Sequence, residues 1–513
     1  MRPIESIIYL LTSFALGTGV LSSEDLGWNQ LRGPNGSGVG EGLAPPIKIE
    51  AKTAAWKVPV APGLSSPVLS KNRIFLTALE NDRLVTIAFD KASGEVVWRK
   101  EAPKTELEKV HKANGPATPT PLVDGKRLYV YFGSYGLLCY DHDGAELWSK
   151  PIPTPKSLYG ASSSPIEHGD NLILVIDNDR NLPDSKLSQS RVVAFKKATG
   201  EIDWETPRHF VRSGWSTPMI WTHHDGEELV ILGTGRVDSY DPKTGKEKWF
   251  ATGFSRETIA MPIAGNGNVY ISSAQLGGGA DENVDPKPFW DAVMRFDKNG
   301  DEKVDRSEMT EHFTFPLRPE LPLGHPGYGI PLPKNEKARM ERQIGMFGWV
   351  DKDKDGFWTK EELYGHLTLR RGRPILMAIR PGGEGDITGT SFVAWELRKS
   401  IPEIPSPLFH ENRIYMVRNG GLLAAVDAVE GELLYRERLG STGQYSASPV
   451  AANGHLYLAS NRGLISVVKM GDTFEVVHEH DLDDPVFVTP AMDATTLYLR
   501  SEGSLWSFRK MSE

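Results

Sequence analysis

Oxygen-bearing side chains recur at alternate positions in one acidic stretch, residues 351–362, whose sequence is DKDKDGFWTKEE. Phe357 offers its backbone carbonyl at the seventh position, and Gly356 stands where such a loop must turn sharply. Hard oxygen ligands at this spacing are the chemistry of Ca²⁺ in an EF-hand loop, and an Asp-rich solvated turn is the alternative. The predicted side-chain ligands, at positions 1, 3, 5, 9 and 12, are Asp351, Asp353, Asp355, Thr359 and Glu362.

A second stretch, residues 297–308, repeats the pattern with one departure. Glu302 stands where glycine is expected, and a left-handed backbone at a non-glycine residue costs about 1 to 2 kcal/mol. Because about 1.4 kcal/mol is a tenfold change in affinity, we expect this loop to bind calcium roughly tenfold more weakly. Its predicted ligands are Asp297, Asn299, Asp301, the carbonyl of Lys303, Asp305 and Glu308.

Apolar residues at helical spacing flank the first of these loops and predict a helix with an apolar side before it and after it. A tenfold excess of calcium over the dissociation constant stabilises a fold by only about 1.4 kcal/mol, which favours structural support over regulation. The apolar positions are Met340, Ile344, Phe347 and Val350 before the loop, and Leu363 and Leu367 after it.

Both acidic stretches lie in an insertion, residues 275–373, that interrupts a series of repeats. Each repeat reads as four short strands and ends in a glycine turn followed by an aromatic residue, as in GEVVW at residues 94–98. A period of about 40 to 45 residues with four strands per unit indicates an all-β, eight-bladed β-propeller. The repeats begin at Ser66-Pro67, Thr120-Pro121, Ser164-Pro165, Thr217-Pro218, Met261-Pro262, Ser406-Pro407, Ser448-Pro449 and Thr489-Pro490.

The ends of the chain predict how the ring closes. The eighth unit stops after its third strand, residues 504–508, and an unclaimed strand of the missing type lies at residues 55–58. Pairing the two would remove an open sheet edge. We expect residues 24–274 to form blades 1–4, the start of blade 5 and the closing strand, and residues 374–513 the remainder. The insertion should stand over the face that carries the connections between blades, and residues 28–38 should form an ordered loop against the ring.

The first 23 residues read as a secretory signal peptide, because Arg2 precedes the apolar run 7–20 and the small residues Ser22 and Ser23 follow. An ordinary N-terminal helix is the alternative. The pattern predicts export to the periplasm or the extracellular space, and no later stretch is apolar enough to span a bilayer. The net charge of −9 without a basic block argues against nucleic acid or an anionic membrane surface as partner.

The repeats resemble the pyrroloquinoline-quinone-like propeller superfamily, which includes quinoprotein alcohol dehydrogenases and the propeller lipoprotein of the outer-membrane assembly machinery. The resemblance is carried by TPLVDGKRLYV at residues 120–130, LCYDHDGAELW at residues 138–148 and the DPKTG turn at residues 241–245. Catalytic members carry an adjacent-cysteine pair at the quinone, whereas Cys139 is the single cysteine here. The resemblance therefore favours a non-enzymatic member, and we assign no catalytic residue.

Two functions follow as hypotheses. The leading one is an exported calcium-binding propeller that acts as a binding or assembly scaffold, with a protein or carbohydrate partner at one face of the ring. The alternative is a pyrroloquinoline-quinone-dependent alcohol or sugar oxidoreductase. Residues that precede first strands could line the channel mouth, although most aromatics there pack in the core; they are His111, Asn114, Tyr159, Arg212, Trp215 and Tyr445.

Overall fold

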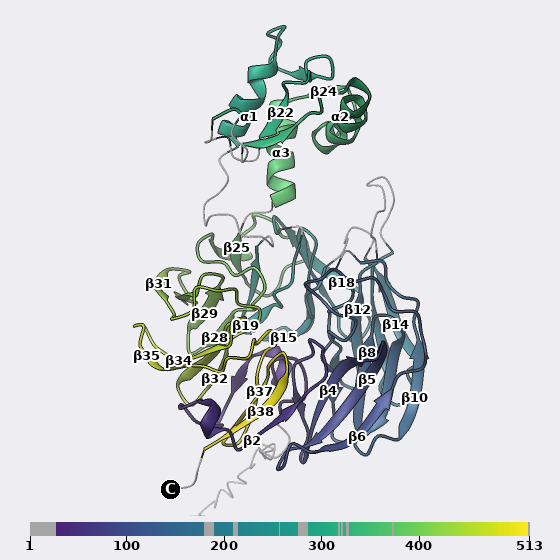
Figure 1. Cartoon of the computed structure of the whole chain (residues 1–513), viewed down its shortest axis with the longest axis vertical. Helices are drawn as coiled ribbons and strands as arrows, with labels where there is room; N and C mark the ends of the chain where they lie inside the picture. The colour runs from purple at the N-terminus through teal and green to yellow at the C-terminus, as the bar shows by residue number, and fades with distance from the viewer. Residues whose placement is uncertain are drawn as a thin grey trace, which may run out of the picture.

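Eight antiparallel sheets of four main strands each form a closed ring in the computed structural model, which confirms the all-β, eight-bladed β-propeller (Figure 1). The blades follow one another in chain order, and the first strand of each is short and begins with a buried residue. The structure describes residues 27–157, 159–178, 189–208, 214–255, 257–274, 286–316, 319, 322–324, 328–371 and 374–510. The predicted signal peptide lies outside these residues.

The first four blades are each built from four strands that are consecutive along the chain. Blade 1 comprises β3 (Val68–Leu69), β4 (Arg73–Glu80), β5 (Arg83–Asp90) and β6 (Val96–Glu101). Blade 2 comprises β7 (Leu122–Val123), β8 (Arg127–Phe132), β9 (Gly136–Asp141) and β10 (Glu146–Pro151). Blade 3 comprises β11 (Ile166–His168), β12 (Asn171–Ile176), β13 (Arg191–Lys196) and β14 (Ile202–Pro207). Blade 4 comprises β15 (Met219–His223), β16 (Gly226–Gly233), β17 (Arg236–Tyr240) and β18 (Glu247–Thr252).

The second half of the ring repeats this order, with the insertion inside blade 5. Blade 5 comprises β19 (Ile263–Gly265), β20 (Asn268–Ser273), β25 (Ile375–Ile379) and β27 (Val393–Leu397). Blade 6 comprises β28 (Leu408–His410), β29 (Arg413–Arg418), β30 (Leu422–Asp427) and β31 (Leu433–Arg438). Blade 7 comprises β32 (Val450–Ala452), β33 (His455–Ala459), β34 (Leu464–Lys469) and β35 (Val476–Asp481). Blade 8 comprises β36 (Ala491–Asp493), β37 (Thr496–Arg500), β38 (Ser504–Arg509) and β2 (Trp56–Pro59).

The last blade confirms the predicted closure of the ring. Strand β2 pairs antiparallel with β38, so that Trp56 lies opposite Ser507 and Pro59 opposite Ser504. The outer strand of blade 8 thus comes from the beginning of the chain and the other three from its end. This pairing ties the two ends of the ring together and leaves no unpaired edge on β38.

Two further strands were not predicted from the repeats. β1 (Val39–Gly40) adds in parallel to the first strand of blade 7, and β26 (Gly385–Asp386) adds in parallel to the outer strand of blade 4. β26 belongs to the connection between the third and fourth strands of blade 5, so one blade covers the outer edge of its neighbour. A two-residue strand has no periodicity of its own, which explains why the sequence pattern did not reveal either one.

The apolar core lies between neighbouring blades. Between blades 1 and 2, for example, Phe75 and Leu84 pack with Leu128 and Val130, and all four side chains are buried. Such a sheet is apolar on both faces and buries each face against the next blade, which is the physical reason for the closed repeat.

The repeated small-residue–proline pairs have a structural role. In six cases the side-chain hydroxyl of the residue before proline accepts a hydrogen bond of 2.9–3.1 Å from the backbone N–H of the same position in the preceding blade. Met261 in blade 5 has no hydroxyl with which to accept such a bond from blade 4. The accepting residues are Thr120, Ser164, Thr217, Ser406, Ser448 and Thr489.

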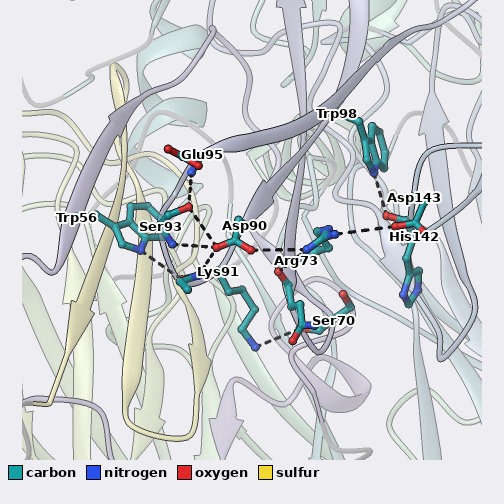
Figure 2. Close-up of polar contacts among 12 residues, drawn as sticks. Trp56, Ser70, Arg73, Asp90, Lys91, Ser93, Glu95, Trp98, His142 and Asp143 are labelled. Atoms are coloured by element: carbon teal, nitrogen blue, oxygen red, sulfur yellow. Dashed lines mark hydrogen bonds and ion pairs between the residues drawn. The ribbon is translucent and has the colours of Figure 1, made fainter.

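The glycine turn and the aromatic residue of successive blades also meet. The indole Nε1 of Trp56 donates to the carbonyl of Lys91 at 3.2 Å, and that of Trp98 donates to the carbonyl of His142 at 2.9 Å (Figure 2). The turn glycine of the next blade lies against each indole, and a Cβ at Gly94 or Gly144 would come within 2.7 or 2.9 Å of it. Only glycine fits there, which explains the repeated turn signature.

Residues 27–45, which include η1 (Pro34–Gly36), lie across one end of the central channel, and we call them the N-terminal plug. Its backbone carbonyls accept hydrogen bonds from the first strands of blades 1, 2 and 7, at Leu69, Val123 and Ala451. The side chain of Arg32, only 1% exposed, donates to the carbonyl of Pro407 in blade 6 at 2.6 Å.

The other four blades also contact the plug. Asn29 donates to Glu167 in blade 3, the side chain of Asn35 bonds to Ile220 in blade 4, and Ala44 donates to Ala494 in blade 8. A Cβ at Gly36 would come within 2.1 Å of Met261 in blade 5. The turns between the first and second strands of the blades lie on one face of the ring, which we call the hairpin face. The N-terminal plug, which was expected to lie against the ring, covers the central channel on this face.

The insertion leaves the ring between β20 and β25, which pair with each other, so its predicted place between the second and third strands of blade 5 is confirmed. Strands alternate in direction, so the insertion stands on the face opposite the hairpin face, where the connections between blades also run. Figure 1 shows this module, in green, standing clear of the ring. It contains α1 (Lys287–Val293), η3 (Met294–Phe296), α2 (Glu336–Val350), α3 (Lys360–Arg371), β21 (Val304–Asp305), β22 (Thr314–Pro316), β23 (Gly329–Pro331) and β24 (Phe357–Trp358).

Among the described residues, which also form η2 (Ala51–Thr53), no helix combines the length and the apolar character needed to cross a membrane.

Candidate functional site

Three carboxylates converge at the end of α2. One oxygen from each of Asp351, Asp353 and Asp355 lies within 4.8 Å of the others. Asp351 is only 8% exposed, and its Oδ1 atom has no hydrogen-bond partner among the described residues. A buried, unpartnered carboxylate oxygen beside two further carboxylates is costly unless a cation neutralises the group. The donor set therefore fits a hard divalent cation.

Glu362 closes the same loop from the first turn of α3. Its Oε1 accepts a 2.7 Å hydrogen bond from the backbone N–H of Lys352, and its Oε2 accepts one of 3.0 Å from that of Thr359. The twelfth residue thus bridges the two ends of the loop. Backbone N–H groups at Asp355 and Phe357 donate to the carboxylates two residues earlier, which fixes the direction of these side chains.

The loop at residues 297–308 has a similar hydrogen-bond pattern but a looser cluster. Glu308 bridges its two ends, accepting from the backbone of Lys298 at 2.8 Å and of Asp305 at 3.1 Å. Asp297 accepts from the N–H groups of Gly300 and Glu302. Its described carboxylates do not supply three oxygens within 4.8 Å of one another, in contrast to the loop at residues 351–362.

Backbone strain is shared between the two loops. Glu302 has φ = 62°, as the missing glycine predicted, but Lys354 in the other loop has φ = 64°. Gly300 and Gly356 occupy the remaining left-handed positions, with φ of 74° and 93°. Each loop therefore carries one strained non-glycine residue. Backbone strain therefore gives no reason to expect weaker calcium binding at residues 297–308. The looser carboxylate cluster still favours weaker binding there.

A short antiparallel pair joins the two loops back to back. Val304 in β21 lies opposite Trp358 in β24, each at the eighth position of its loop, and both side chains are fully buried. Trp358 stacks on Phe347 of α2 with ring centroids 5.5 Å apart. The apolar core of the module thus connects both loops through packed side chains.

Both helices predicted around residues 351–362 are present, as α2 and α3, but the predicted apolar side of α2 is only partly buried. Phe347, Val350 and Leu363 are buried as expected, but Met340 and Ile344 on α2 are 56% and 62% exposed, so their assignment to the packed side was wrong. No helix follows residues 297–308, because the chain continues through a turn to β22. The side chain of Leu367 is outside the part of the chain whose side chains the structure describes.

Residues expected at the channel mouth pack together near blades 2 and 3. The Tyr159 ring lies 4.9 Å from both the His111 and the Trp215 rings, edge to face, and its carbonyl accepts a hydrogen bond from Asn114. Tyr445 is separate and 1% exposed. Arg212 lies outside the described residues. These side chains make packing contacts, as expected for most aromatics there.

Cys139 lies in β9 and is fully buried between blades 2 and 3. Burial raises the pKa of its thiol to about 12. A thiol in this state neither reacts as a thiolate nor coordinates a metal. It is a small core residue.

Sequence reasoning missed a buried ionic cluster between blades 3 and 4. Arg208 donates to Asp177 at 2.8 Å and lies 3.6 Å from Asp238, which also pairs with Arg236. Burial raises the pKa of Asp238 despite these cations. The four residues are scattered along the chain, so only the fold brings them together.

His223 and His224 have a spacing found in metal sites, and the adjacent Asp225 offers a possible third ligand. Ligand atoms of His223, His224 and Asp225 lie within 4.8 Å of one another. However, Nδ1 of His223 accepts from the backbone of Asp225, and its Nε2 faces Glu228 at 3.2 Å. Nδ1 of His223 is therefore occupied by a protein N–H, whereas Nε2 lies beside a carboxylate without a hydrogen bond among the described residues.

The sequence matches the family described as outer membrane protein assembly factor BamB over residues 47–208, 87–280 and 386–510. No curated protein matches it. The fold is similar to BamB from Moraxella catarrhalis, with 10% identity, a TM-score of 0.50 and coverage of 90% of this chain and 99% of that one.

It is also similar to the europium-containing methanol dehydrogenase, with 11% identity, a TM-score of 0.52 and coverage of 95% and 99%. The designed protein Ika8 gives 9% identity, a TM-score of 0.50 and coverage of 88% and 98%. At such low identity these solved structures show the shared fold.

Proposed function

The chain belongs to the family of the outer membrane protein assembly factor BamB, and we propose that it is an exported, calcium-binding propeller that acts as a binding or assembly scaffold. In this proposal calcium is held by the loops at residues 351–362 and 297–308 of the insertion. The partner, a protein or a carbohydrate, binds at a face of the ring.

The observation that carries the calcium proposal is the buried, unpartnered oxygen of Asp351 beside the carboxylates of Asp353 and Asp355. Calcium would neutralise their mutual repulsion and take further oxygens from Thr359 and Glu362. The second loop would use Asp297, Asn299, Asp301, Lys303, Asp305 and Glu308 in the same way.

Bound calcium has a structural consequence in this arrangement. The loop at residues 351–362 joins α2 to α3, and the buried Trp358 at its eighth position packs on α2. Neutralising the loop would therefore hold the two helices at a fixed angle and preserve the apolar core of the module. This is support of the insertion, and it needs no switch between two states.

Isothermal titration of the full mature chain with CaCl₂ tests the calcium proposal. We expect saturable binding with a dissociation constant of about 0.1 to 1 mM, as for extracellular sites. Asp351→Asn should weaken it at least about tenfold, whereas Asp82→Asn, at an exposed turn of blade 1, should leave it unchanged. Absence of binding in the unaltered chain, or an equal affinity in Asp351→Asn, would refute the proposal.

The scaffold role is supported by the family and by the plug. The family's namesake is an assembly factor, and such a role needs surfaces rather than a reactive centre. The N-terminal plug bonds to the blades on the hairpin face, so we expect a ligand inside the ring to enter from the face that carries the insertion. Export and a periplasmic or extracellular location are supported by the N-terminal pattern of the sequence and by this family.

The alternative, a quinone-dependent alcohol or sugar oxidoreductase, has less support. Likeness to the methanol dehydrogenase concerns the fold, and the single cysteine is buried in β9 and cannot form an adjacent pair. Reconstitution with pyrroloquinoline quinone followed by dye reduction tests this alternative. Turnover above the quinone-free control would favour it over the scaffold.

A further inference from the structure

A cavity of about 820 Å³ opens on the hairpin face beside the N-terminal plug. Part of its wall is the plug itself, including Val39 and Leu43, and the rest comes from blades 5, 6 and 7. This volume falls within the range of about 300 to 1,000 Å³ that is typical of ligand sites. No residue of the calcium loops lines it.

Apolar side chains form the body of this cavity. Trp28, Leu43, Phe409 and Met470 all contribute to its lining. Phe409 is held in place by stacking on Tyr270, with ring centroids 5.7 Å apart and planes inclined by 12°. The indole N–H of Trp28 has no acceptor among the described residues. The wall is therefore fixed by packing and presents apolar surface.

The acidic side chains that line the cavity carry negative charge. Glu41 and Glu411 are both exposed at its rim, and none of the described lining residues is Lys or Arg. The neighbouring Arg413 is engaged by Asp472 at 2.7 Å, and His410 lies 3.6 Å from the carboxylate of Glu411. An apolar cavity with two carboxylates at its rim is complementary to a group with an apolar body and a positive charge.

The plug also supplies a strand edge. β1 is the terminal strand of its sheet, paired with β32 on one side only, and both Val39 and Gly40 of β1 line the cavity. On the side away from β32 the backbone N–H of Val39 donates to the hydroxyl of Ser37 at 3.2 Å, which leaves the carbonyl of Val39 to accept a hydrogen bond from an extended peptide whose side chains enter the cavity. β26 already adds in this parallel manner to the outer edge of blade 4.

We infer that this cavity receives an extended segment of a partner protein, with an apolar side chain in the cavity and a Lys or Arg against Glu41 and Glu411. The inference deepens the proposed scaffold role and rests on it for its biological meaning. Its chemistry is independent of calcium, because the cavity and the calcium loops lie on opposite faces of the ring.

Titration of the full mature chain with two tetrapeptides, in the presence of EGTA, tests the inference. The first, acetyl-Lys-Phe-Lys-Leu-amide, should bind saturably, and the charge-reversed acetyl-Glu-Phe-Glu-Leu-amide should bind at least about tenfold more weakly. The double variant Glu41→Gln/Glu411→Gln should lower the affinity for the basic peptide about fivefold, since each exposed ion pair contributes modestly. Raising the salt concentration should also lower the affinity for the basic peptide.

A matched control removes two charges elsewhere. Glu95→Gln/Glu432→Gln changes exposed carboxylates on the outer turns of blades 1 and 6, and should leave the affinity unaltered. Equal affinity for the two peptides, no saturable heat with the basic one, or an unchanged affinity in Glu41→Gln/Glu411→Gln would each overturn the inference. Because calcium is chelated throughout, these outcomes do not depend on whether the insertion binds it.

Discussion

The side-chain amide of Asn35 pairs with both backbone polar groups of Ile220. Its Nδ2 donates to the carbonyl at 2.7 Å, and its Oδ1 accepts from the N–H at 3.1 Å. Asn35 itself is left-handed, with φ = 47°, a conformation that asparagine tolerates well. One plug residue thus extends the first strand of blade 4 and fixes the plug to the side of the ring opposite blade 8.

Replacing Asn35 by alanine should destabilise the protein by about 1 to 3 kcal/mol, because two backbone groups of Ile220 lose their side-chain partner. Urea unfolding followed by circular dichroism measures this change. Asn171→Ala, which removes an exposed hydrogen bond to Asp203, should cost far less. Equal losses in the two variants would mean that the plug contributes no more than a surface contact.

The turn glycines predict a matched pair of substitutions in blade 3. Gly200 and Gly169 both have positive φ, at 71° and 57°, but a Cβ at Gly200 would come within 2.7 Å of the Trp148 ring whereas one at Gly169 meets nothing within 4 Å. Gly200→Ala should therefore lower the unfolding free energy by at least about 1 kcal/mol more than Gly169→Ala. Thermal or urea unfolding gives both values, and similar losses would contradict the packing role of Gly200.

Glu108 predicts a dependence of stability on pH. Burial raises the pKa of its carboxyl to about 7, although the backbone N–H of Ala161 donates to it. A carboxyl with a raised pKa binds more protons in the folded state than in the unfolded state, so this group lowers stability as pH rises from about 4.5 to 7. Glu108→Gln should be more stable than the unaltered chain at pH 8, by about 1 to 3 kcal/mol, with the difference fading towards pH 5. Parallel stability curves for the two proteins would exclude this account.

If the chain is exported, the mature protein should begin at a defined residue. Cleavage after Ser22 or Ser23 would leave a few residues before the plug, whose Trp28 is 1% exposed and whose carbonyl bonds to Leu69. Intact-mass spectrometry of the secreted or periplasmic protein should show loss of 22 or 23 residues. Retention of the whole N-terminus, or cleavage beyond Trp28, would contradict this prediction.

Local signals in the sequence were sufficient for the ring. Ser406, Ser448 and their equivalents lie before proline because their hydroxyls join neighbouring blades, and the turn glycines recur because the next indole leaves no room for a Cβ. A contact that is repeated in each blade requires the same residue types at regular intervals, and this periodic pattern predicts the blades from the sequence.

Contacts that do not recur from blade to blade could not be predicted from the sequence. The plug residues Asn29 and Asn35 bond to blades 3 and 4, and nothing in a turn-rich stretch specifies such distant partners. Met340 and Ile344 have helical spacing yet face outwards, because the spacing gives a helix its apolar stripe without saying whether a neighbouring element covers it. The strain expected at Glu302 was correct, but its counterpart at Lys354 could be seen only in the backbone.

The most direct test of the central claim, calcium in the insertion, is terbium luminescence sensitised by tryptophan, because Trp358 lies within the loop at residues 351–362. We predict saturable luminescence that calcium displaces, that falls strongly in Glu362→Gln, and that persists in the control Glu432→Gln. Absence of luminescence in the unaltered chain, or an unchanged signal in Glu362→Gln, would contradict the account.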